Sequence, residues 1–436
     1  MNPLIDRRHF LKSTSLLAGA VALPQIVPSR VLGAEGQTAP SNQITVGCIG
    51  VGGMGTSNMQ KFLGLEGARV VAVCDVSEER RGKAKQLVDA KYGDTGCAML
   101  ADFRELLARE DIDAVSIAAP DHWNAFMAIA AARAGKDLYC EKPMGVSLEQ
   151  SQAIRKAVRE HKRVFQAGTW QRSQKHFRQA CEAARNGYLG KIHTVEVSTA
   201  GPQFMPNYKG PRVMQPPPQV PKGFDWKMWL GPAPEVDYHP ARHNGDWFLI
   251  RDYTNGFIVN WGVHHLDIAL WGMPELGTVP FEVECKATYH NEGFTDTAKQ
   301  WSAVFNYENG LKLIFKDQYQ MKTGCWFFGD IGWVWVDRPG NEAAPTAPLK
   351  NPLKPEDTPL YKSDNHQGNF IECVHSRKDP VSDVDATHVA SYLGLVADIA
   401  AKLETKLKWN PRTEQFIGND AANALLKRPA SSTWAL

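Results

Sequence analysis

The chain has 436 residues, of which 43% are hydrophobic and 22% are charged, a composition typical of a soluble globular protein. This length exceeds what one hydrophobic core usually serves and therefore predicts two domains. The formal net charge of +2 argues against nucleic acid or an acidic membrane surface as the main partner.

Residues 1–34 predict an export signal. Arg7 and Arg8 are followed by an apolar run at 16–23, and residues 32–34 fit a small-residue cleavage site. The apolar run is too short to span a bilayer, and the twin arginine resembles a Tat signal, which directs folded proteins out of the cytoplasm. We therefore expect a periplasmic or otherwise exported protein with no membrane partner after signal removal, although a basic, frayed N-terminus is the alternative.

Residues 42–168 alternate apolar strand runs with helical segments, which predicts a parallel, doubly wound sheet. Cys48, Cys74 and Cys140 lie in these runs without a CxxC neighbour, so we expect small buried side chains and neither metal ligands nor disulfides. The five expected strands are 41–50, 68–75, 113–120, 136–143 and 163–168.

The first strand run ends in GVGGMG, which has the G-x-G-x-x-G spacing of a dinucleotide site between a strand and a helix. Gly50 permits a tight turn, Gly52 lets the backbone approach a pyrophosphate, and Gly55 allows close packing of helix and strand. The N-terminus of the helix then offers unpaired N–H groups to the phosphates. The other loop positions assigned to this site are Val51, Gly53 and Met54.

Asp75 ends the second strand run, where a carboxylate can accept hydrogen bonds from the ribose hydroxyls of NAD and would repel the 2′-phosphate of NADP. Arg80 and Arg81 follow closely and could meet that phosphate. The sequence therefore predicts NAD, with NADP as the less favoured alternative.

The pattern changes after residue 168. Residues 169–385 predict an α+β domain with a large, mainly antiparallel open sheet, whose open face favours a homo-oligomer. Residues 386–436 predict a helical segment that packs on the domains. The expected strands of the second domain are 191–200, 281–289, 299–307, 311–319, 324–329 and 331–336.

Residues 201–256 form a long insertion rich in proline, glycine and aromatic side chains. Disordered tracts are poor in aromatics, and long loops in compact proteins are often functional. We therefore expect an ordered loop near a binding site.

Two further segments carry candidate chemistry. Glu141 and Lys142 end the fourth strand run, at the edge of a parallel sheet where ligands bind, and a lysine there can transfer protons when its pKa is lowered. A surface ion pair of the two is an equally good interpretation from spacing alone. The segment 260–272 predicts a helix, and because each residue turns about 100°, His264 and His265 should point in different directions and have different functions.

Three motifs in this order, GVGGMG at 50–55, EKP at 141–143 and GVH at 262–264, resemble the Gfo/Idh/MocA family of oxidoreductases over most of the mature chain. The resemblance implies a Rossmann domain followed by a second, α+β domain, and use of NAD or NADP to oxidise or reduce a sugar, inositol or related polyol carbon. It also implies cofactor contacts from Ala119, Pro120, His122, Glu141 and Lys142.

The resemblance assigns acid–base catalysis to Lys142 and His264, with Asn260 positioning the substrate or His264. A satisfied core histidine is the alternative for His264. The family often has aspartate where this chain has Asn260, and asparagine can orient a partner but supplies no charge. Lys142 would then carry more of the proton transfer, or the substrate would differ. His265 is expected to pack or to form a hydrogen bond.

The function implied is hydride transfer between nicotinamide and a secondary alcohol of a sugar or sugar derivative. Two alternatives remain: an NAD-dependent glycoside hydrolase or lyase that oxidises a sugar carbon transiently, and a non-catalytic sugar or nucleotide sensor. Trp226, Trp229 and Trp247 could stack on sugar rings, although packing is favoured for each one singly. No metal ligand is expected, and the assigned substrate contacts are Arg172, Trp247, Tyr253 and Asp267.

Overall fold

The computed structural model describes residues 42–204, 219–290, 293–350, 353–429 and 434. The predicted export signal lies outside the described residues, as do residues 205–218 of the insertion. No helix in the described ranges is long and apolar enough to cross a membrane.

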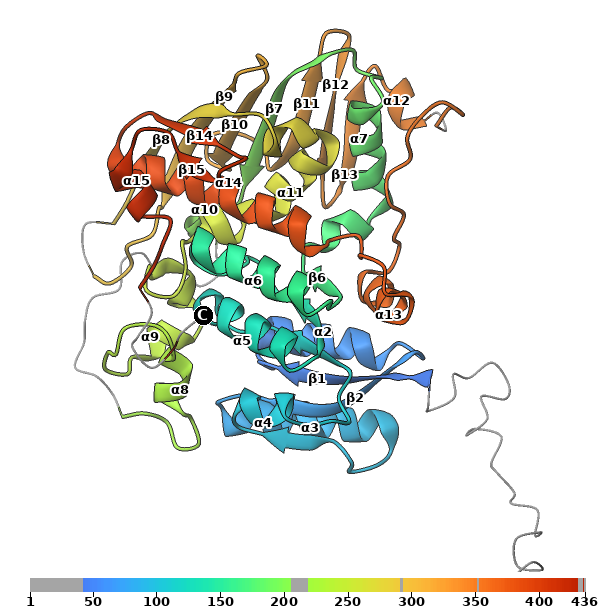
Figure 1. Cartoon of the computed structure of the whole chain (residues 1–436), viewed down its shortest axis with the longest axis vertical. Coiled ribbons are helices and arrows are strands. Elements are labelled where there is room, and N and C mark those ends of the chain that lie inside the picture. The colour runs from blue at the N-terminus through green and yellow to red at the C-terminus, as the bar shows by residue number, and fades with distance from the viewer. Residues whose placement is uncertain (1–41, 205–218, 291–292, 351–352, 430–433, 435–436) are drawn as a thin grey trace, which may run out of the picture. The chain divides into compact units, whose positions relative to one another are not determined.

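The N-terminal domain is a six-stranded parallel sheet in the order β3-β2-β1-β4-β5-β6, with helices on both faces, which confirms the predicted doubly wound architecture (Figure 1). Its strands are β1 (Ile44–Ile49), β2 (Ala68–Cys74), β3 (Ala98–Leu100), β4 (Ala114–Ile117), β5 (Asp137–Cys140) and β6 (Phe165–Ala167). Its helices are α2 (Gly53–Leu63), α3 (Glu78–Tyr92), α4 (Phe103–Leu107), α5 (Asp121–Arg133) and α6 (Leu148–Glu160).

One strand of this sheet, β3, is not predicted by the sequence pattern. β3 is a three-residue edge strand with no fully buried side chain, so it lacks the continuous apolar run by which the other strands were found. The five expected strands are all present. The strand order reverses beside β1, which pairs with both β2 and β4, and ligands of such sheets bind at the carboxyl ends of the strands at this point.

The second domain is a nine-stranded sheet in the order β13-β12-β11-β7-β10-β9-β8-β14-β15. All its pairings are antiparallel except that of β7 with β10, so the predicted mainly antiparallel sheet is confirmed. Its strands are β7 (Ile192–Thr199), β8 (Phe281–Thr288), β9 (Gln300–Tyr307), β10 (Lys312–Asp317), β11 (Gly324–Gly329), β12 (Gly332–Asp337), β13 (Gly340–Ala344), β14 (Leu407–Asn410) and β15 (Gln415–Phe416).

Helices and helical turns accompany this sheet along the rest of the chain. They are η4 (Trp170–Ser173), α7 (Lys175–Arg185), η5 (Pro202–Phe204), α8 (Trp226–Leu230), α9 (Pro240–His243), η6 (Asp246–Leu249), α10 (Phe257–Asn260), α11 (Gly262–Gly272), η7 (Pro274–Gly277), α12 (Ala347–Lys350), α13 (His366–Ser376), α14 (Val384–Leu403) and α15 (Asp420–Ala424).

The C-terminal segment is not purely helical, contrary to the prediction for residues 386–436. β14 pairs with β8 and carries β15, so this segment extends the sheet after α14. Short strands stabilised by a partner far away in the sequence leave little local signal. α14 itself packs against α11, β8 and α6, and thereby holds the two domains together (Figure 1).

The predicted helix at 260–272 is also broken. α10 ends at Asn260 and α11 begins at Gly262, because the His264 amide bonds to the carbonyl of Trp261 and tightens the turn between them. The two helices bury nearly all their side chains under the sheet, in the largest hydrophobic cluster of the described chain.

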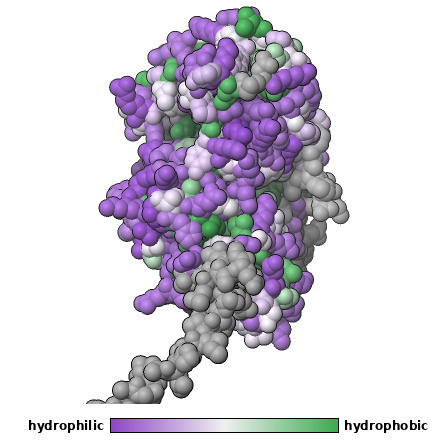
Figure 2. Space-filling view, turned by 90° about the vertical axis from the view of Figure 1, so that its right-hand side faces the viewer, coloured by the Kyte–Doolittle hydropathy of each residue, from purple (hydrophilic) through white to green (hydrophobic). Residues whose placement is uncertain are grey.

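Within the insertion, residues 219–256 are ordered and form a small core of their own. Trp229, Leu230, Ile250 and Tyr253 are buried together, and Trp226 stacks on Trp229 with ring centroids 4.9 Å apart. The indoles of α8 therefore pack on each other, and that of Trp229 also on Tyr253 of the insertion and His122 of α5, and not on the sheet. Elsewhere, the face seen in Figure 2 is mostly hydrophilic, with hydrophobic residues in small separate groups.

Candidate active site

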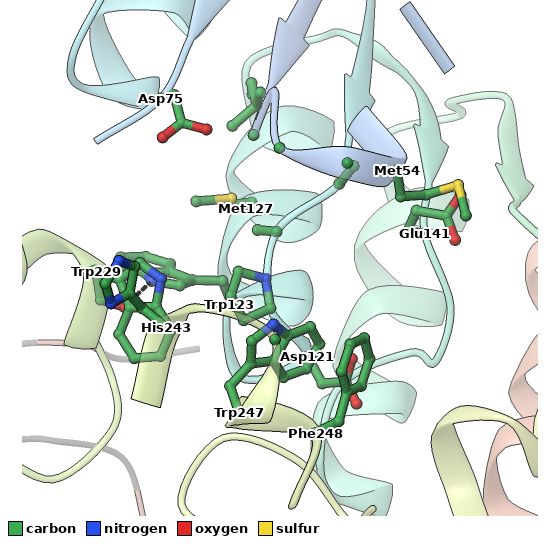
Figure 3. Close-up of a pocket in the computed structure, with 18 of the residues that line it drawn as sticks. Met54, Asp75, Asp121, Trp123, Met127, Glu141, Trp229, His243, Trp247 and Phe248 are labelled. Atoms are coloured by element: carbon green, nitrogen blue, oxygen red, sulfur yellow. Dashed lines mark hydrogen bonds between the residues drawn. The ribbon is translucent and has the colours of Figure 1, made fainter. Parts of the chain in front are cut away.

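A cavity of about 660 Å³ lies at the carboxyl ends of β1, β2, β4 and β5, and the second domain and the insertion close its other sides. Figure 3 shows Asp75 at one strand end, Met54 with Glu141 on another side, and Trp229 with His243 facing from the insertion. The sequence-predicted residues that line it are Gly50, Gly52, Gly53, Met54, Asp75, Ala119, Pro120, Glu141, Lys142, Trp229, Trp247, Asn260 and His264.

The glycine loop has the geometry of a phosphate cradle. Gly50 adopts φ +76°, and a Cβ on Gly55 would lie 1.8 Å from the carbonyl oxygen of Gly50, so no larger residue fits there. A Cβ on Gly52 would meet only the Arg80 guanidinium, at 3.7 Å, which leaves the backbone open to the cavity. α2 begins at Gly53 without a side-chain cap, so its first N–H groups are available to an anion.

Asp75 lies directly after β2 and is buried at the wall of this cradle. Its carboxylate accepts hydrogen bonds from the backbone N–H groups of Val51 and Ser77, both at 2.9 Å. Burial raises the pKa of Asp75, and these two hydrogen bonds oppose the rise. Val51 therefore contributes through its backbone, because its side chain is buried away from the cavity. Arg80 lines the cavity, whereas Arg81 donates to the Asp75 carbonyl at 2.9 Å.

Lys142 is held by a chain of hydrogen bonds that crosses between the domains. Its Nζ donates to Oδ1 of Asn260 at 3.0 Å and to the carbonyl of Asn260 at 3.2 Å. The Asn260 Nδ2 donates in turn to both carboxylate oxygens of Asp121, at 2.7 and 2.9 Å. Thr254 donates to the same carboxylate at 2.7 Å. Asn260 thus links an ammonium to a carboxylate.

Charge and burial act against each other in this chain. Burial raises the pKa of Asp121 to about 6, against the opposing charge of Lys142. Burial lowers the pKa of Lys142. The negative charges of Glu141 and Asp121 oppose this decrease, and the positive charge of Arg338 adds to it. Sequence reasoning did not find Asp121. Its one signal was its place, a carboxylate next to Pro120 at the carboxyl end of a parallel strand.

Glu141 lines the cavity, but its carboxylate is hydrogen-bonded to another side chain of the protein. Its Oε1 accepts from Nδ2 of Asn58 at 2.9 Å, and a Cβ on Gly168 would lie 2.6 Å from its carboxylate. The backbone at Gly168 therefore packs directly on this carboxylate. Glu141 holds the strand end and supplies negative charge beside Lys142.

The two histidines have different surroundings. His264 lines the cavity, and its Nδ1 has no hydrogen-bond partner among the described residues. Burial, together with the charges of Lys142 and Arg338, lowers the pKa of His264 well below its ordinary value, so this ring is neutral near pH 7. His265 instead bonds through Nε2 to Asp337 at 2.9 Å, as expected for a hydrogen-bonded packing residue.

Four predicted contacts lie outside the cavity lining. Arg172 and Asp267, proposed to bind substrate, bind each other through two hydrogen bonds of 2.7 Å, so the charges of both are neutralised. His122 bonds the carbonyl of Trp229 at 3.1 Å. The Tyr253 hydroxyl accepts from Arg242 at 3.1 Å, and the Tyr253 side chain is fully buried.

Two other predicted positions act through packing, Gly55 as the glycine motif predicts and Trp226 as the favoured interpretation for each tryptophan. Gly55 acts through packing and does not line the cavity, and Trp226 reaches it only through Trp229. Sequence reasoning also missed Arg338, which follows β12 and lines the cavity together with Trp170 and Trp261. Within the described ranges, no group of three or more His, Cys, Asp or Glu side chains is placed to hold a metal ion, and all eight cysteines are buried free thiols.

A phosphate cradle on a Rossmann sheet, joined to a lysine and a histidine in one cavity, defines a nicotinamide-dependent oxidoreductase. Two family models match the chain. The oxidoreductase family's NAD-binding Rossmann fold matches residues 44–169, and its C-terminal alpha/beta domain matches residues 174–436. The chain therefore belongs to the Gfo/Idh/MocA oxidoreductase family.

The individual proteins that the chain resembles share only part of its sequence. The chain is 29% identical to the uncharacterized oxidoreductase YrbE of Bacillus subtilis over 65% of this chain and 70% of that one. It is 34% identical to an alpha-N-acetylgalactosaminidase of Shewanella oneidensis, over only 34% of this chain and 35% of that one. The structure of scyllo-inositol dehydrogenase from Lactobacillus casei, with bound NAD(H) and scyllo-inositol, superposes with a TM-score of 0.59 at 15% identity. That match covers 84% of this chain and 99% of the other.

Proposed function

We propose that the protein transfers hydride between NAD and a secondary alcohol of a sugar or polyol. The observation that carries this proposal is the Lys142 ammonium, which a buried amide and carboxylate hold in the same cavity as the glycine cradle. When bound, the nicotinamide supplies the hydride chemistry. Gly50, Gly52 and the first turn of α2 would hold the pyrophosphate, and Asp75 the adenosine ribose.

Lys142 moves the proton. In its neutral form it accepts the proton of the substrate hydroxyl, and burial favours that form because it lowers the pKa of the amine. In the reverse direction the ammonium returns the proton. His264 is neutral, and its ring offers one donor and one acceptor to orient the hydroxyl.

Asp121 supplies the negative charge that Asn260 lacks. The family's usual aspartate would stand directly against Lys142, whereas here the amide stands between the ammonium and a carboxylate on α5. Negative charge is therefore retained near Lys142, and it comes from Asp121 of the same N-terminal domain by way of Asn260 of the second domain. The side-chain orientation of Asn260 follows from these partners, since its Nδ2 faces the carboxylate and its Oδ1 the ammonium.

The cofactor is proposed to be NAD. The Asp75 carboxylate, already buried, would repel a 2′-phosphate in the same space. Arg80 on the cavity wall keeps NADP as the second possibility. Mass spectrometry of the purified protein would identify any retained dinucleotide.

The direct test is hydride exchange into labelled substrate. Lys142→Met should abolish exchange, and Lys156→Met, at an exposed position on α6, should leave it unchanged. Unchanged exchange in Lys142→Met would overturn the assignment. A sensor without turnover would show no exchange in the unsubstituted protein either.

A second candidate is redox-neutral glycoside cleavage with transient oxidation of a sugar carbon. The similarity to an alpha-N-acetylgalactosaminidase favours it, although that match spans about a third of each chain. Cleavage of aryl glycosides without added nucleotide and without net NADH would establish it.

We propose export on the basis of Arg7 and Arg8, and a reporter fused to residues 1–34 should lose export when both become lysine.

A homo-oligomer is proposed from the outer face of the second sheet. Trp326, Phe328 and Trp333 are only partly buried there, where a partner sheet could cover them. Sedimentation of the purified protein tests this.

A further inference from the structure

We propose that the substrate carries a carboxylate and that Arg338 binds it. This inference rests on the proposed function and names its substrate class: an acidic sugar, such as a uronate or an aldonate, in place of a neutral polyol.

Arg338 stands at the end of β12, on the cavity wall that also presents His264 and faces Lys142. Its guanidinium carbon lies 5.1 Å from the ring centroid of Trp170 and 4.9 Å from that of Trp261. Two indole rings thus hold the guanidinium in place.

Among the described residues, the Arg338 guanidinium has no hydrogen bond and no ion pair, and its Nε is buried without a partner. Other arginines with buried guanidinium groups have hydrogen-bond acceptors for them, and Arg242 donates to the Tyr253 hydroxyl at 3.1 Å. Arg172 meets Asp267 and Arg251 meets Asp398 through two hydrogen bonds each. A half-buried cation without a counter-charge is costly, and the ring faces offset only part of that cost.

The neighbouring carboxylates already form hydrogen bonds with other groups of the protein. Asp337 accepts from His265, from Thr323 and from the backbone N–H of Arg338 itself. Asp121 is bonded to Asn260 and Thr254, and Glu141 to Asn58. This end of the cavity therefore presents positive charge that the protein does not neutralise.

A carboxylate is the ligand that best matches a guanidinium. The planar fork of N–H donors meets two carboxylate oxygens at once, and charge-assisted hydrogen bonds are about twice as strong as neutral ones. A hydroxyl of a neutral sugar could occupy one N–H but would leave the charge unpaired. The cofactor phosphates would lie at Gly52 and α2, where Arg80 is the neighbouring arginine, so Arg338 is left to the substrate.

The test is calorimetric binding to the NAD-loaded protein, with glucose, glucuronate, glucose 6-phosphate and glucose 6-sulfate as probes. We expect glucuronate to bind at least about 10-fold more tightly than glucose, and Arg338→Gln to remove about 100-fold of affinity for glucuronate while leaving glucose nearly unchanged. Arg338→Lys keeps the charge without the fork and should recover only part of the loss. Arg109→Gln, at a surface ion pair, is the matched control.

Equal binding of glucose and glucuronate, or an equal loss of both in Arg338→Gln, would overturn the inference. So would Arg338-dependent binding in which the phosphate or sulfate ester exceeds the carboxylate. NAD retention and circular dichroism of each variant show that it is folded. If glucuronate binds through Arg338 but no sugar is oxidised or cleaved, the proposed function fails and the carboxylate site stands.

Discussion

Replacing Asp121 by asparagine should shift the acid limb of the pH profile for alcohol oxidation to lower pH. Asp121 is linked to Lys142 through Asn260 by hydrogen bonds of 2.7 and 3.0 Å. With the width of the amide between them, the two charges lie within about 8 Å, and at an effective dielectric constant of 20 they attract by about 2 kcal/mol, equivalent to about 1.5 pH units.

The direction of this pH shift follows from the form of Lys142 that accepts the proton, which is the neutral amine. Asp121 and Glu141 raise the pKa of Lys142, while burial and Arg338 lower it, and His264 beside it is neutral. Loss of the Asp121 charge therefore lowers the pKa of the amine, and neutral Lys142 persists to more acid pH. Above about pH 6, where Asp121 itself is ionised, the limb should move down by about 1.5 pH units.

The assay is kcat/KM for NADH formation between pH 5 and 10. Thr254→Val is the matched control, because it removes a hydrogen bond to Asp121 and keeps the carboxylate. Loss of this hydrogen bond raises the pKa of Asp121, so the acid limb of Thr254→Val should stay in place wherever Asp121 remains ionised. A uniform fall in kcat/KM at every pH in Asp121→Asn, with no displacement of the limb, would refute the electrostatic role and leave Asp121 as a packing residue.

Three further outcomes are expected. Gly55→Ala should abolish dinucleotide retention, because its Cβ would lie 1.8 Å from a backbone oxygen, whereas Gly82→Ala, with no atom within 4 Å, should retain the nucleotide by absorbance. Asp267→Asn should lower the free energy of unfolding by about 3–5 kcal/mol in urea titrations, and Arg172→Met with Asp267→Leu should recover much of it; an unchanged stability would return both residues to candidate substrate contacts. Asp75→Ala should weaken NAD binding at least about 10-fold and reduce discrimination against NADP in titrations, and unchanged discrimination would place selectivity elsewhere.

Local patterns indicated much of the N-terminal domain. Its strands are short apolar runs separated by helical segments. Both the apolar runs and the helical periodicity can be recognised within windows of about ten residues. β3 was missed because its side chains are exposed or only partly buried, and β14 because its partner strand, β8, lies far away in the sequence. The break between α10 and α11 was also hidden, since it depends on one tightened turn within a continuous apolar segment.

Candidate residues divide in the same way. Lys142 and His264 stand in motifs whose strand or helix is readable locally, and both line the cavity. Arg172 and Asp267 looked like equally good binding residues from their positions. They neutralise each other instead, and two charges that lie 95 residues apart give no sequence signal of their pairing.

The sequence by itself determined the periodicity of the strands and helices, the glycine turn and the motifs that contain the candidate residues Lys142 and His264, because each depends on neighbouring residues. Only the tertiary structure decided which charges are paired. It set Asp121 behind Asn260 and left Arg338 between two indoles without a carboxylate. Electrostatic interactions depend on distance in space and on burial, and neither quantity is written in the order of the residues.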